Sequence, residues 1–209
     1  MGADIHLHVE VKTEQGWRQA SRDEIKPWDD RNYSVFAMLA DVRNGYGFAG
    51  SDLGDPVVPI AAPRGLPQDV CAGVLGEHEE WGPDAHSASH FTGAELVAVP
   101  WSANTITHRA WVRRTKGSVV RPQESHDDYA ARLQEAATFL GYMPPAENWQ
   151  YEMCGWSSEG QGDSGWRTIE WAESWARAAG PAFLGFVLDL ARLSQGRPEN
   201  VRAVFWFDN

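Results

Sequence analysis

The sequence predicts an α+β fold, and three observations support that class. A strand-like alternation begins the chain, an apolar strand-like run ends it, and helix-like segments without regular βαβ spacing lie between them. We expect a single domain over residues 1–209, with a mixed or antiparallel sheet that pairs the N-terminal and C-terminal strands. Irregular loop insertions are expected at about residues 44–67 and 144–165, where Gly, Pro and polar residues follow no period.

The first expected elements are a hairpin and a helix. Apolar and polar residues alternate over 3–11, a period of two, and 17–19 can return as a short partner strand. Apolar residues recur at helical spacing over 31–43, where Asp29 or Asp30 can cap the helix. The Asn-Gly pair that follows is expected to end it.

Two further helices are expected around a polar loop. Pro67 can begin a short helix that ends near Trp81. Residues 83–91 are polar and lack a period, so we expect a loop there. Thr92 and Glu95 then match a capping box, which predicts a short helix behind them.

The next segment predicts a hairpin and a capped helix. Residues 105–114 and 118–121 read as two strands joined by a Lys-Gly turn. Ser125 and Asp128 match a second capping box, and the helix behind them is expected to end at Gly141.

The C-terminal part is expected to contain a strand, a broken helix and a buried strand. Residues 166–171 can form the first strand, and 173–194 a helix interrupted at Gly180 and Pro181. Residues 201–207 are almost continuously apolar, which predicts a strand covered on both faces.

Composition and charge narrow the classes of function. The net charge of -11 opposes binding to long nucleic acid, although residues 101–125 hold five basic residues against one acidic. We expect no membrane span, because no apolar run approaches about 20 residues. The first residues lack the pattern of a signal peptide, so we expect a cytoplasmic protein in which Cys71 and Cys154 are reduced.

Tryptophan is unusually frequent, with 11 residues. We expect those on periodic or apolar segments to fill the core: Trp171 and Trp175, four residues apart as on one helix face, and Trp206. We expect those near irregular segments to form part of a pocket wall that can stack a flat ligand: Trp28, Trp81, Trp101, Trp149 and Trp156.

The first candidate site lies on the N-terminal strand. Alternation places Asp4, His6, His8 and Glu10 on one face. Carboxylate and imidazole at this spacing can share a divalent metal. The same residues could instead do acid–base work without metal, or form the polar face of an edge strand.

The second candidate site is the polar loop. His86 could act as a general acid or base, and Ser87 or Ser89 as a nucleophile or ligand contact. Equally, the polar side chains of this loop could bond only to neighbouring backbone.

The third candidate set consists of arginines in a Gly- and Pro-rich context. Arg31, followed by Asn32, and Arg43 and Arg64 could hold a phosphate or carboxylate. Alternatively, these guanidinium groups could pair with the abundant carboxylates of the chain.

The chain resembles an uncharacterised family of bacteriophage and actinobacterial proteins. The resemblance covers Gly2 to Asn209 and lies in five motifs: GxDIHxxVE, DRNYxxFAxLADVRN, PRGLP, HSxS and a C-terminal FWFDN. His8 and His90 fall outside its pattern. The residues that match it are Asp4, His6, Arg31, Asn32, Arg43, Arg64, Asp84, His86, Ser87, Ser89, Asp208 and Asn209.

The candidate residues predict a protein that acts on a small anionic, nucleotide-like ligand, and the resemblance implies that it is a phage-type accessory protein. We expect a hydrolase in which Asp4, His6, His86 and Asp208 are catalytic. Asp4, His6 and Asp208 could hold a divalent metal (Zn, Mn or Mg). The expected ligand contacts are Arg31, Asn32, Arg43, Arg64, Ser87 and Ser89. The alternative is a noncatalytic protein that sequesters a ligand or inhibits a host defence; a structural role is least favoured.

Overall fold

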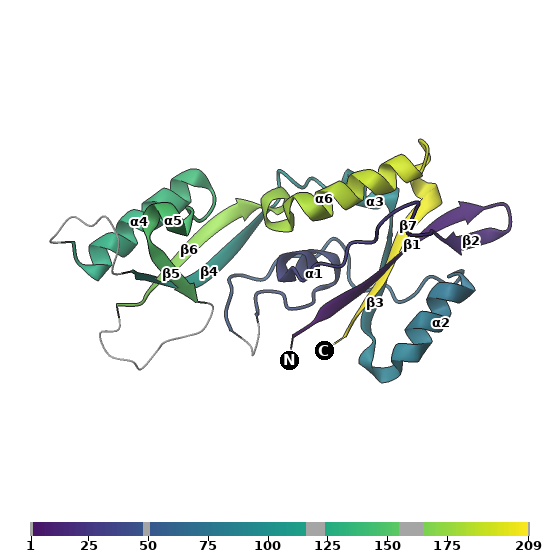
Figure 1. Cartoon of the computed structure of the whole chain (residues 1–209), viewed down its shortest axis with the longest axis horizontal. Coiled ribbons are helices and arrows are strands. Elements are labelled where there is room, and N and C mark those ends of the chain that lie inside the picture. The colour runs from purple at the N-terminus through teal and green to yellow at the C-terminus, as the bar shows by residue number, and fades with distance from the viewer. Residues whose placement is uncertain (1, 48–50, 116–123, 155–164, 209) are drawn as a thin grey trace. The chain divides into compact units, whose positions relative to one another are not determined.

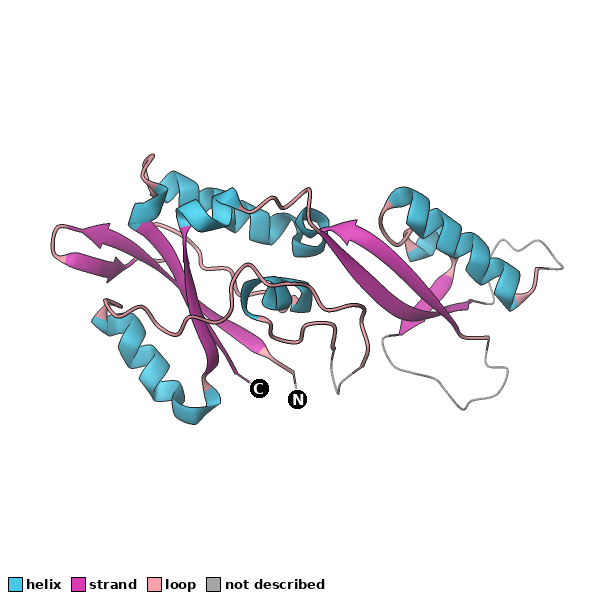
Figure 2. Cartoon of the chain, turned by 180° about the vertical axis from the view of Figure 1, so that it is seen from behind, coloured by secondary structure: helices cyan, strands magenta, loops and turns pink. Residues whose placement is uncertain are grey.

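The computed structural model describes residues 2–47, 51–115, 124–154 and 165–208 (Figure 1). The chain divides into two compact units. The first consists of Met1–Asn44, Val58–Trp101 and Ala176–Asn209, and the second of Gly45–Val57 and Ser102–Trp175. Each unit combines strands with helices (Figure 2), so the predicted α+β class is confirmed. That the chain folds as a single domain remains a prediction.

The first unit is built on an antiparallel sheet with strand order β2-β1-β7-β3. Its strands are β1 (Asp4–Thr13), β2 (Gly16–Gln19), β3 (His86–Thr92) and β7 (Val201–Asp208). The predicted pairing of the first and last strands is confirmed, with a register that runs from Asp4 opposite Asp208 to Val11 opposite Val201. Residues 201–207 are all buried, as expected for a strand covered on both faces.

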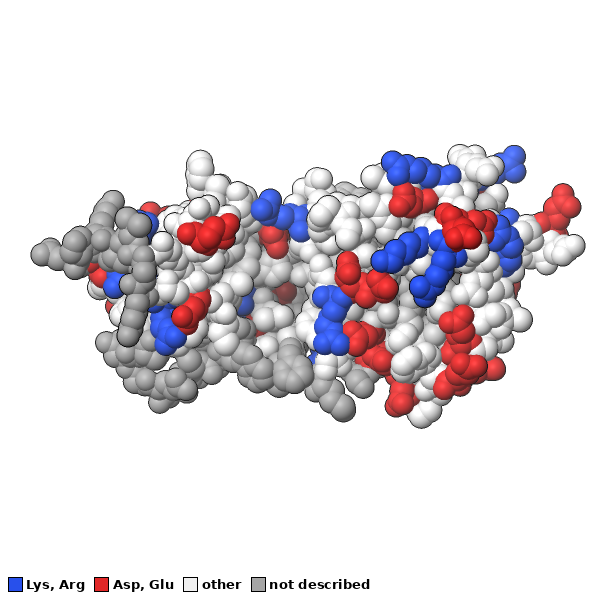
Figure 3. Space-filling view, in the orientation of Figure 1, with Lys and Arg blue, Asp and Glu red and all other residues white. Residues whose placement is uncertain are grey.

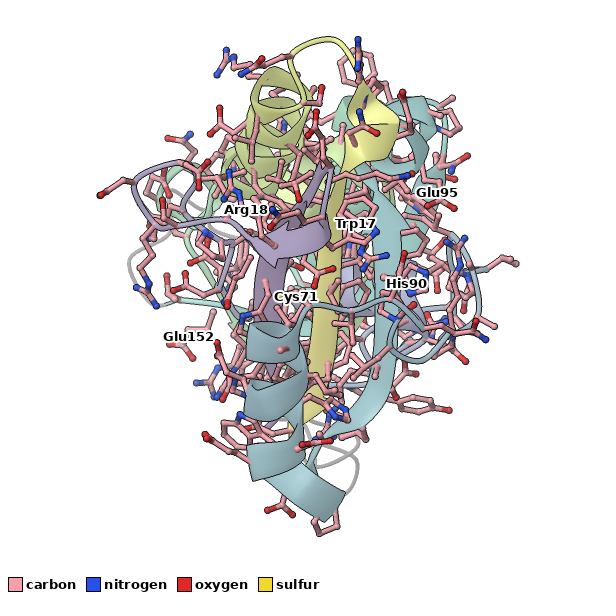
Figure 4. All side chains as sticks on the ribbon, turned by 90° about the vertical axis from the view of Figure 1, so that its right-hand side faces the viewer. Trp17, Arg18, Cys71, His90, Glu95 and Glu152 are labelled. Atoms are coloured by element: carbon pink, nitrogen blue, oxygen red, sulfur yellow. The ribbon has the colours of Figure 1, made fainter. Side chains whose placement is uncertain are left out.

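Helices cover both faces of this sheet. They are α1 (Tyr33–Ala40), α2 (Ala72–Trp81), α3 (Gly93–Ala98) and α6 (Trp175–Leu193), with short 3-10 turns η2 (Gly82–Asp84) and η3 (Pro198–Asn200). On one face, Phe36 of α1 and Phe183 of α6 belong to the same buried cluster as Phe207. On the other, Val74 of α2 packs with Val204 and Trp206. Figure 4 shows α2, with Cys71 at its start, in front of the sheet.

Two helix boundaries differ from those predicted. Helix α1 begins at Tyr33 because the Asn32 side chain, not Asp29 or Asp30, accepts the Val35 backbone N–H at 3.2 Å. It ends at Asp41, which adopts a left-handed conformation with φ 61°. Helix α2 begins at Ala72 rather than at Pro67. For α1 the helical period extends beyond the residues that make helical hydrogen bonds. Pro67 begins a turn before α2, in which its carbonyl accepts the Val70 N–H at 3.1 Å.

The loop predicted over residues 83–91 is wrong, since most of it forms strand β3. Its backbone pairs with β7, and Phe91 is fully buried in the cluster that contains Phe205. The register shifts between His86 and Ser89, at the point where Ser87 has a φ of 52°. Strand β3 pairs with β7, which lies more than 100 residues away in the chain. The local sequence therefore shows no alternation that would indicate a strand. The capping box that follows, Thr92 with Glu95, is confirmed at the start of α3.

The second unit contains an antiparallel sheet with order β5-β4-β6 and two helices. Its elements are β4 (Thr105–Arg114), α4 (His126–Leu140), α5 (Ala146–Trp149), β5 (Tyr151–Cys154) and β6 (Arg167–Ser174). Val112, Tyr129, Leu133 and Ile169 form the centre of its core. The capping box of Ser125 and Asp128 and the helix end at Gly141 are confirmed.

Other predictions in the second half of the chain had mixed outcomes. The insertion at 144–165 contains α5 and β5, so residues 146–154 are not irregular. The expected strand at 118–121 lies outside the described residues, and the described partners of β4 are β5 and β6. The break in α6 is confirmed at Gly180, whose φ is 77°. Among the described helices, none is long and apolar enough to cross a membrane.

Candidate functional site

A cavity of about 310 Å³ lies along β1 in the first unit, and we refer to it as the β1 cavity. Its walls come from β1, from β2 and the segment after it, from α2 and from β7. The polar and aromatic side chains among its lining residues are His6, His8, Gln19, Arg22, Lys26, Asp29, Glu77, Trp81 and Trp206.

The cavity exists because β2 is shorter than β1. Pairing with β2 begins only at Glu10, and the Ala20 backbone N–H closes the ladder with a 2.7 Å hydrogen bond to the Val9 carbonyl. The segment of β1 before Val9 therefore lacks a strand partner on this edge among the described residues. Ile5 and Leu7 line the cavity although their side chains are buried in the core, which places their backbone at its wall.

A histidine–carboxylate pair lies at one end of the cavity. His6 Nε2 is 3.3 Å from Asp208 Oδ2, an ion-pair distance without the alignment of a hydrogen bond. Asp208 Oδ1 accepts a 3.1 Å hydrogen bond from the Asp4 backbone N–H. The two side chains keep 25% and 21% of their surface exposed, so solvent and a ligand can reach them.

Aromatic rings surround His6. The Trp81 indole lies 4.1 Å from the imidazole, centroid to centroid, with an angle of 40° between the planes. On the sheet, Trp206 stacks with His6 at 5.9 Å and with His8 at 4.8 Å. Trp206 is 1% exposed, and its indole nitrogen has no hydrogen-bond partner in the described part of the chain. The rings leave an apolar, flat surface next to an acid–base group.

His8 is held in its neutral form. Burial lowers the pKa of His8 below its ordinary value, and the nearby Glu77 only partly opposes this shift. The Gln19 amide lies 3.1 Å from Nδ1, and Glu77 Oε2 lies 3.7 Å from Nε2. The Gln19 contact is a hydrogen bond in which the amide N–H donates to Nδ1 of the neutral ring, whereas the Glu77 contact is longer than a hydrogen bond.

Arginine 22 is the cation left over at the cavity. Lys26 lies 4.0 Å from Asp29, and Glu77 contacts His8 and Gln19. Within the part of the chain that the structure describes, Arg22 has no ion pair. Elsewhere on the face drawn in Figure 3, basic and acidic side chains lie beside one another. The cavity lining carries two cations, Arg22 and Lys26, and two carboxylates, Asp29 and Glu77, so its charges balance. Arg22 is the cation there that can pair with an anionic group of a small ligand.

The predicted cluster of Asp4, His6 and Asp208 does come together at the end of the β1–β7 pair. However, Arg31 binds both oxygens of Asp4, with Nε to Oδ1 at 2.7 Å and Nη2 to Oδ2 at 2.5 Å. This hydrogen bonding lowers the pKa of Asp4. The described residues contain no group of three or more side chains placed to hold a metal ion. The donor set thus does not fit the metal site expected from the sequence.

His86 is not brought to this cluster. It lies opposite Phe207 in the β3–β7 register and stacks on that ring at 6.1 Å. Phe207 points into the α1–α6 core, whereas Trp206, the register partner of His6, points toward α2. His86 and His6 therefore lie on opposite faces of the sheet. The Oγ of Ser87 lies 3.1 Å from His86 Nδ1, a contact between neighbours in the chain.

The other predicted ligand contacts have structural partners. Asn32 caps α1 and donates to the Ala178 carbonyl at 2.9 Å. Arg43 lies 5.9 Å from the Tyr33 ring. Beside β3, Arg64 pairs with Glu95 at 2.7 Å, and its backbone N–H donates to the Oγ of buried Ser89 at 3.2 Å.

The tryptophans divide differently from the prediction. Trp81 lines the cavity, and Trp175 and Trp206 are buried, as expected. Three predicted wall residues instead pack in or against a core: Trp28, Trp101 and Trp149. Trp171 lies on strand β6, so it does not share a helix face with Trp175. Trp156 lies outside the described residues.

Sequence reasoning missed Gln19, Arg22 and Glu77. Each comes from a different segment, and no local pattern links a hairpin end, the following loop and a helix. His8 was visible in the alternation of β1 but was left out of the expected site. Comparison with protein-family models, curated proteins and solved structures finds no match for this chain.

Proposed function

We propose that the chain binds a small, planar, anionic ligand in the β1 cavity and hydrolyses it with His6 as general base. One observation carries the proposal: His6 lies at the cavity with the carboxylate of Asp208 beside it and the Trp81 ring against it. In many acid–base sites, a carboxylate orients the imidazole that takes up the proton.

The pair supplies a defined proton path. A small rotation of the His6 ring would direct Nε2–H at Asp208 Oδ2, which lies 3.3 Å away, and would leave Nδ1 as the proton acceptor. His6 can then take a proton from a water molecule as that water attacks a phosphate ester. The P–O bond to the leaving group breaks, and the imidazolium returns the proton to the leaving oxygen. Asp208 stabilises the imidazolium between these two steps.

The cavity suits a ligand with a ring and one anionic group. Its volume of about 310 Å³ lies at the small end of ligand sites, which commonly measure about 300–1,000 Å³. Trp81 can stack a flat ring, and Arg22 can bind a phosphate. No step of this mechanism passes through a metal, because Arg31 occupies both oxygens of Asp4.

A second function, binding without turnover, is supported by a specific feature of the same pair. The 3.3 Å contact between His6 and Asp208 lacks hydrogen-bond alignment. In this case the cavity would sequester its ligand. The role of a phage-type accessory protein in the bacterial cytoplasm, which the sequence resemblance implies, is compatible with either function and is part of the proposal.

The test combines binding with phosphate release. The full chain is mixed with nucleoside monophosphates and with 4-nitrophenyl phosphate, and binding is measured by calorimetry. Phosphate release should occur with the natural chain and fall by about 10²–10⁴-fold in His6→Gln. Asp208→Asn should also lower it. His90→Gln serves as the matched control, because His90 contacts the Gly65 carbonyl and does not line the cavity.

Three outcomes distinguish the alternatives. Release that depends on His6 but not on His90 supports the hydrolase. Binding without release, unchanged in His6→Gln, supports the sequestering protein and overturns the hydrolase. Neither binding nor release with any of these compounds would overturn both functions.

A further inference from the structure

We infer that the unpaired edge of β1 recognises the ring of the ligand as a nucleobase, through the Ile5 carbonyl and the Leu7 N–H. This inference rests on the proposed binding function and adds the chemical class of the ring. The aminopurine edge of adenine, which places an N–H donor beside a ring-nitrogen acceptor, is the matching partner.

The direction of these backbone groups follows from the pairing around them. In an antiparallel sheet, the backbone N–H and C=O of successive residues point alternately to the two edges of the strand. The Val9 carbonyl points to the β2 side, where Ala20 donates to it at 2.7 Å. Leu7 and Ile5, two and four residues earlier, therefore direct their N–H and C=O groups to the same side.

These groups are left without strand partners in the described structure. The β1–β2 register begins at Glu10, and the opposite edge of β1 pairs with β7. Ile5 and Leu7 line the cavity, and their residues as a whole are only 6% exposed. The Leu7 N–H and the Ile5 carbonyl lose water at the cavity wall without gaining a hydrogen-bond partner in the protein. A ligand that forms hydrogen bonds with both groups therefore gains binding free energy.

A ring fits this edge better than a peptide strand does. The open stretch is short, because Ala20 closes it at Val9, so an added strand could make only a few main-chain hydrogen bonds there. Flat apolar surfaces are contributed by Trp81 on α2 and by Pro27 after β2. Arg22 supplies the charge for a phosphate attached to the ring. An extended peptide would use neither the aromatic surface nor the cation.

The experiment follows the backbone amides directly. The full chain, labelled with ¹⁵N, is titrated with AMP, with purine riboside 5′-monophosphate and with ribose 5-phosphate. AMP should slow hydrogen exchange of the Leu7 amide by about tenfold or more and bind at least about tenfold more tightly than ribose 5-phosphate. Purine riboside monophosphate, which lacks the amino donor to Ile5, should fall between them. The Leu133 amide, in the core of the second unit, is the internal reference.

A charge-matched pair of variants tests the phosphate contact. Arg22→Ala should weaken AMP binding about tenfold and leave adenosine binding unchanged. Arg197→Ala removes an exposed arginine of the same unit that does not line the β1 cavity, so it should bind AMP normally.

The outcomes separate this inference from the proposed function. If AMP and ribose 5-phosphate bind equally and the Leu7 amide does not respond, the nucleobase inference is overturned while a small-anion site remains. If a short blocked peptide such as acetyl-Thr-Val-Thr-amide protects Leu7 and AMP does not, the edge is a peptide site and the inference is also wrong. If none of the compounds binds, the proposed function itself fails.

Discussion

Replacing Glu10 by alanine should destabilise the first unit by about 3–5 kcal/mol, because it removes the buried counter-charge of Arg202 and leaves only the exposed carboxylate of Asp69. Glu10 is 0% exposed, and its Oε2 lies 2.6 Å from Nε of Arg202, which is 5% exposed. The other oxygen of Glu10 accepts the Cys71 backbone N–H at 2.7 Å. The substitution thus removes the partner of a buried charge and of a backbone donor together.

The structure provides an internal control for this magnitude. Asp69 binds the same arginine, with Oδ1 2.7 Å from Nη1, but its side chain is 68% exposed. Asp69→Ala should therefore cost no more than about 1 kcal/mol, as is usual for exposed ion pairs. Asp69→Ala also removes the exposed 2.9 Å hydrogen bond from the Trp17 indole N–H to Asp69, whereas Glu10→Ala leaves this bond and the 4.0 Å stacking of Trp17 on the guanidinium in place. Glu10→Met combined with Arg202→Met should recover most of the stability, since no buried charge is then left unpaired.

Urea unfolding followed by circular dichroism gives the free energies, and hydrogen exchange of the buried Phe205 amide assigns the loss to the first unit. The expected order of stability is the natural chain, then Asp69→Ala, with Glu10→Ala far below both. Equal losses in Glu10→Ala and Asp69→Ala would refute the reasoning. So would a double variant that is less stable than Glu10→Ala, because the pair would then be stabilising in its own right.

Three further predictions concern local features. Because burial places the pKa of His8 below its ordinary 6.5, the unfolded chain takes up that proton first as pH falls. Its stability contribution is therefore complete above about pH 6.5 and declines below it; His8→Gln should flatten the fall in melting temperature between about pH 7.5 and 5.5, whereas His90→Gln should keep it. Gly54→Ala should destabilise the second unit by at least about 1–3 kcal/mol in urea unfolding, since φ is 137° and the new Cβ would overlap the Thr107 carbonyl oxygen; an unchanged midpoint would contradict this. Ser125→Ala should cost about 1 kcal/mol and fray the start of α4, measured by amide exchange there, while Ser125→Asp should restore the cap.

Elements with strong local signals were predictable. These signals depend on residues only a few positions apart in the chain. They are the alternation of β1, the apolar run of β7 and the two capping boxes. Strand β3 gives no such signal, because its residues are mostly half-buried and its register shifts between His86 and Ser89. The start of α1 was misplaced by the two acidic residues before Asn32, which make equally good caps in sequence alone.

The site was predictable only where it follows from strand pairing. Pairing the first and last strands was enough to place Asp4, His6 and Asp208 together. It was not enough to place His86, because one residue of register decides which face a side chain occupies. Strand pairing also could not show that the Arg31 guanidinium would bind the Asp4 carboxylate. A chain of net charge -11 offers an arginine many carboxylates, and the sequence does not say which one it binds.

The sequence by itself determined the α+β class, the partnership of the terminal strands and the histidine–carboxylate pair at their end. These follow from periods and from residue chemistry, which act over short distances along the chain. Only the tertiary structure decided that β2 pairs with β1 from Glu10 onward and leaves the first part of β1 open on that edge. Only the tertiary structure placed Trp81, Gln19 and Arg22 around the cavity along this open edge. A cavity is the space that packing leaves unfilled between segments remote in sequence, so no local pattern records it.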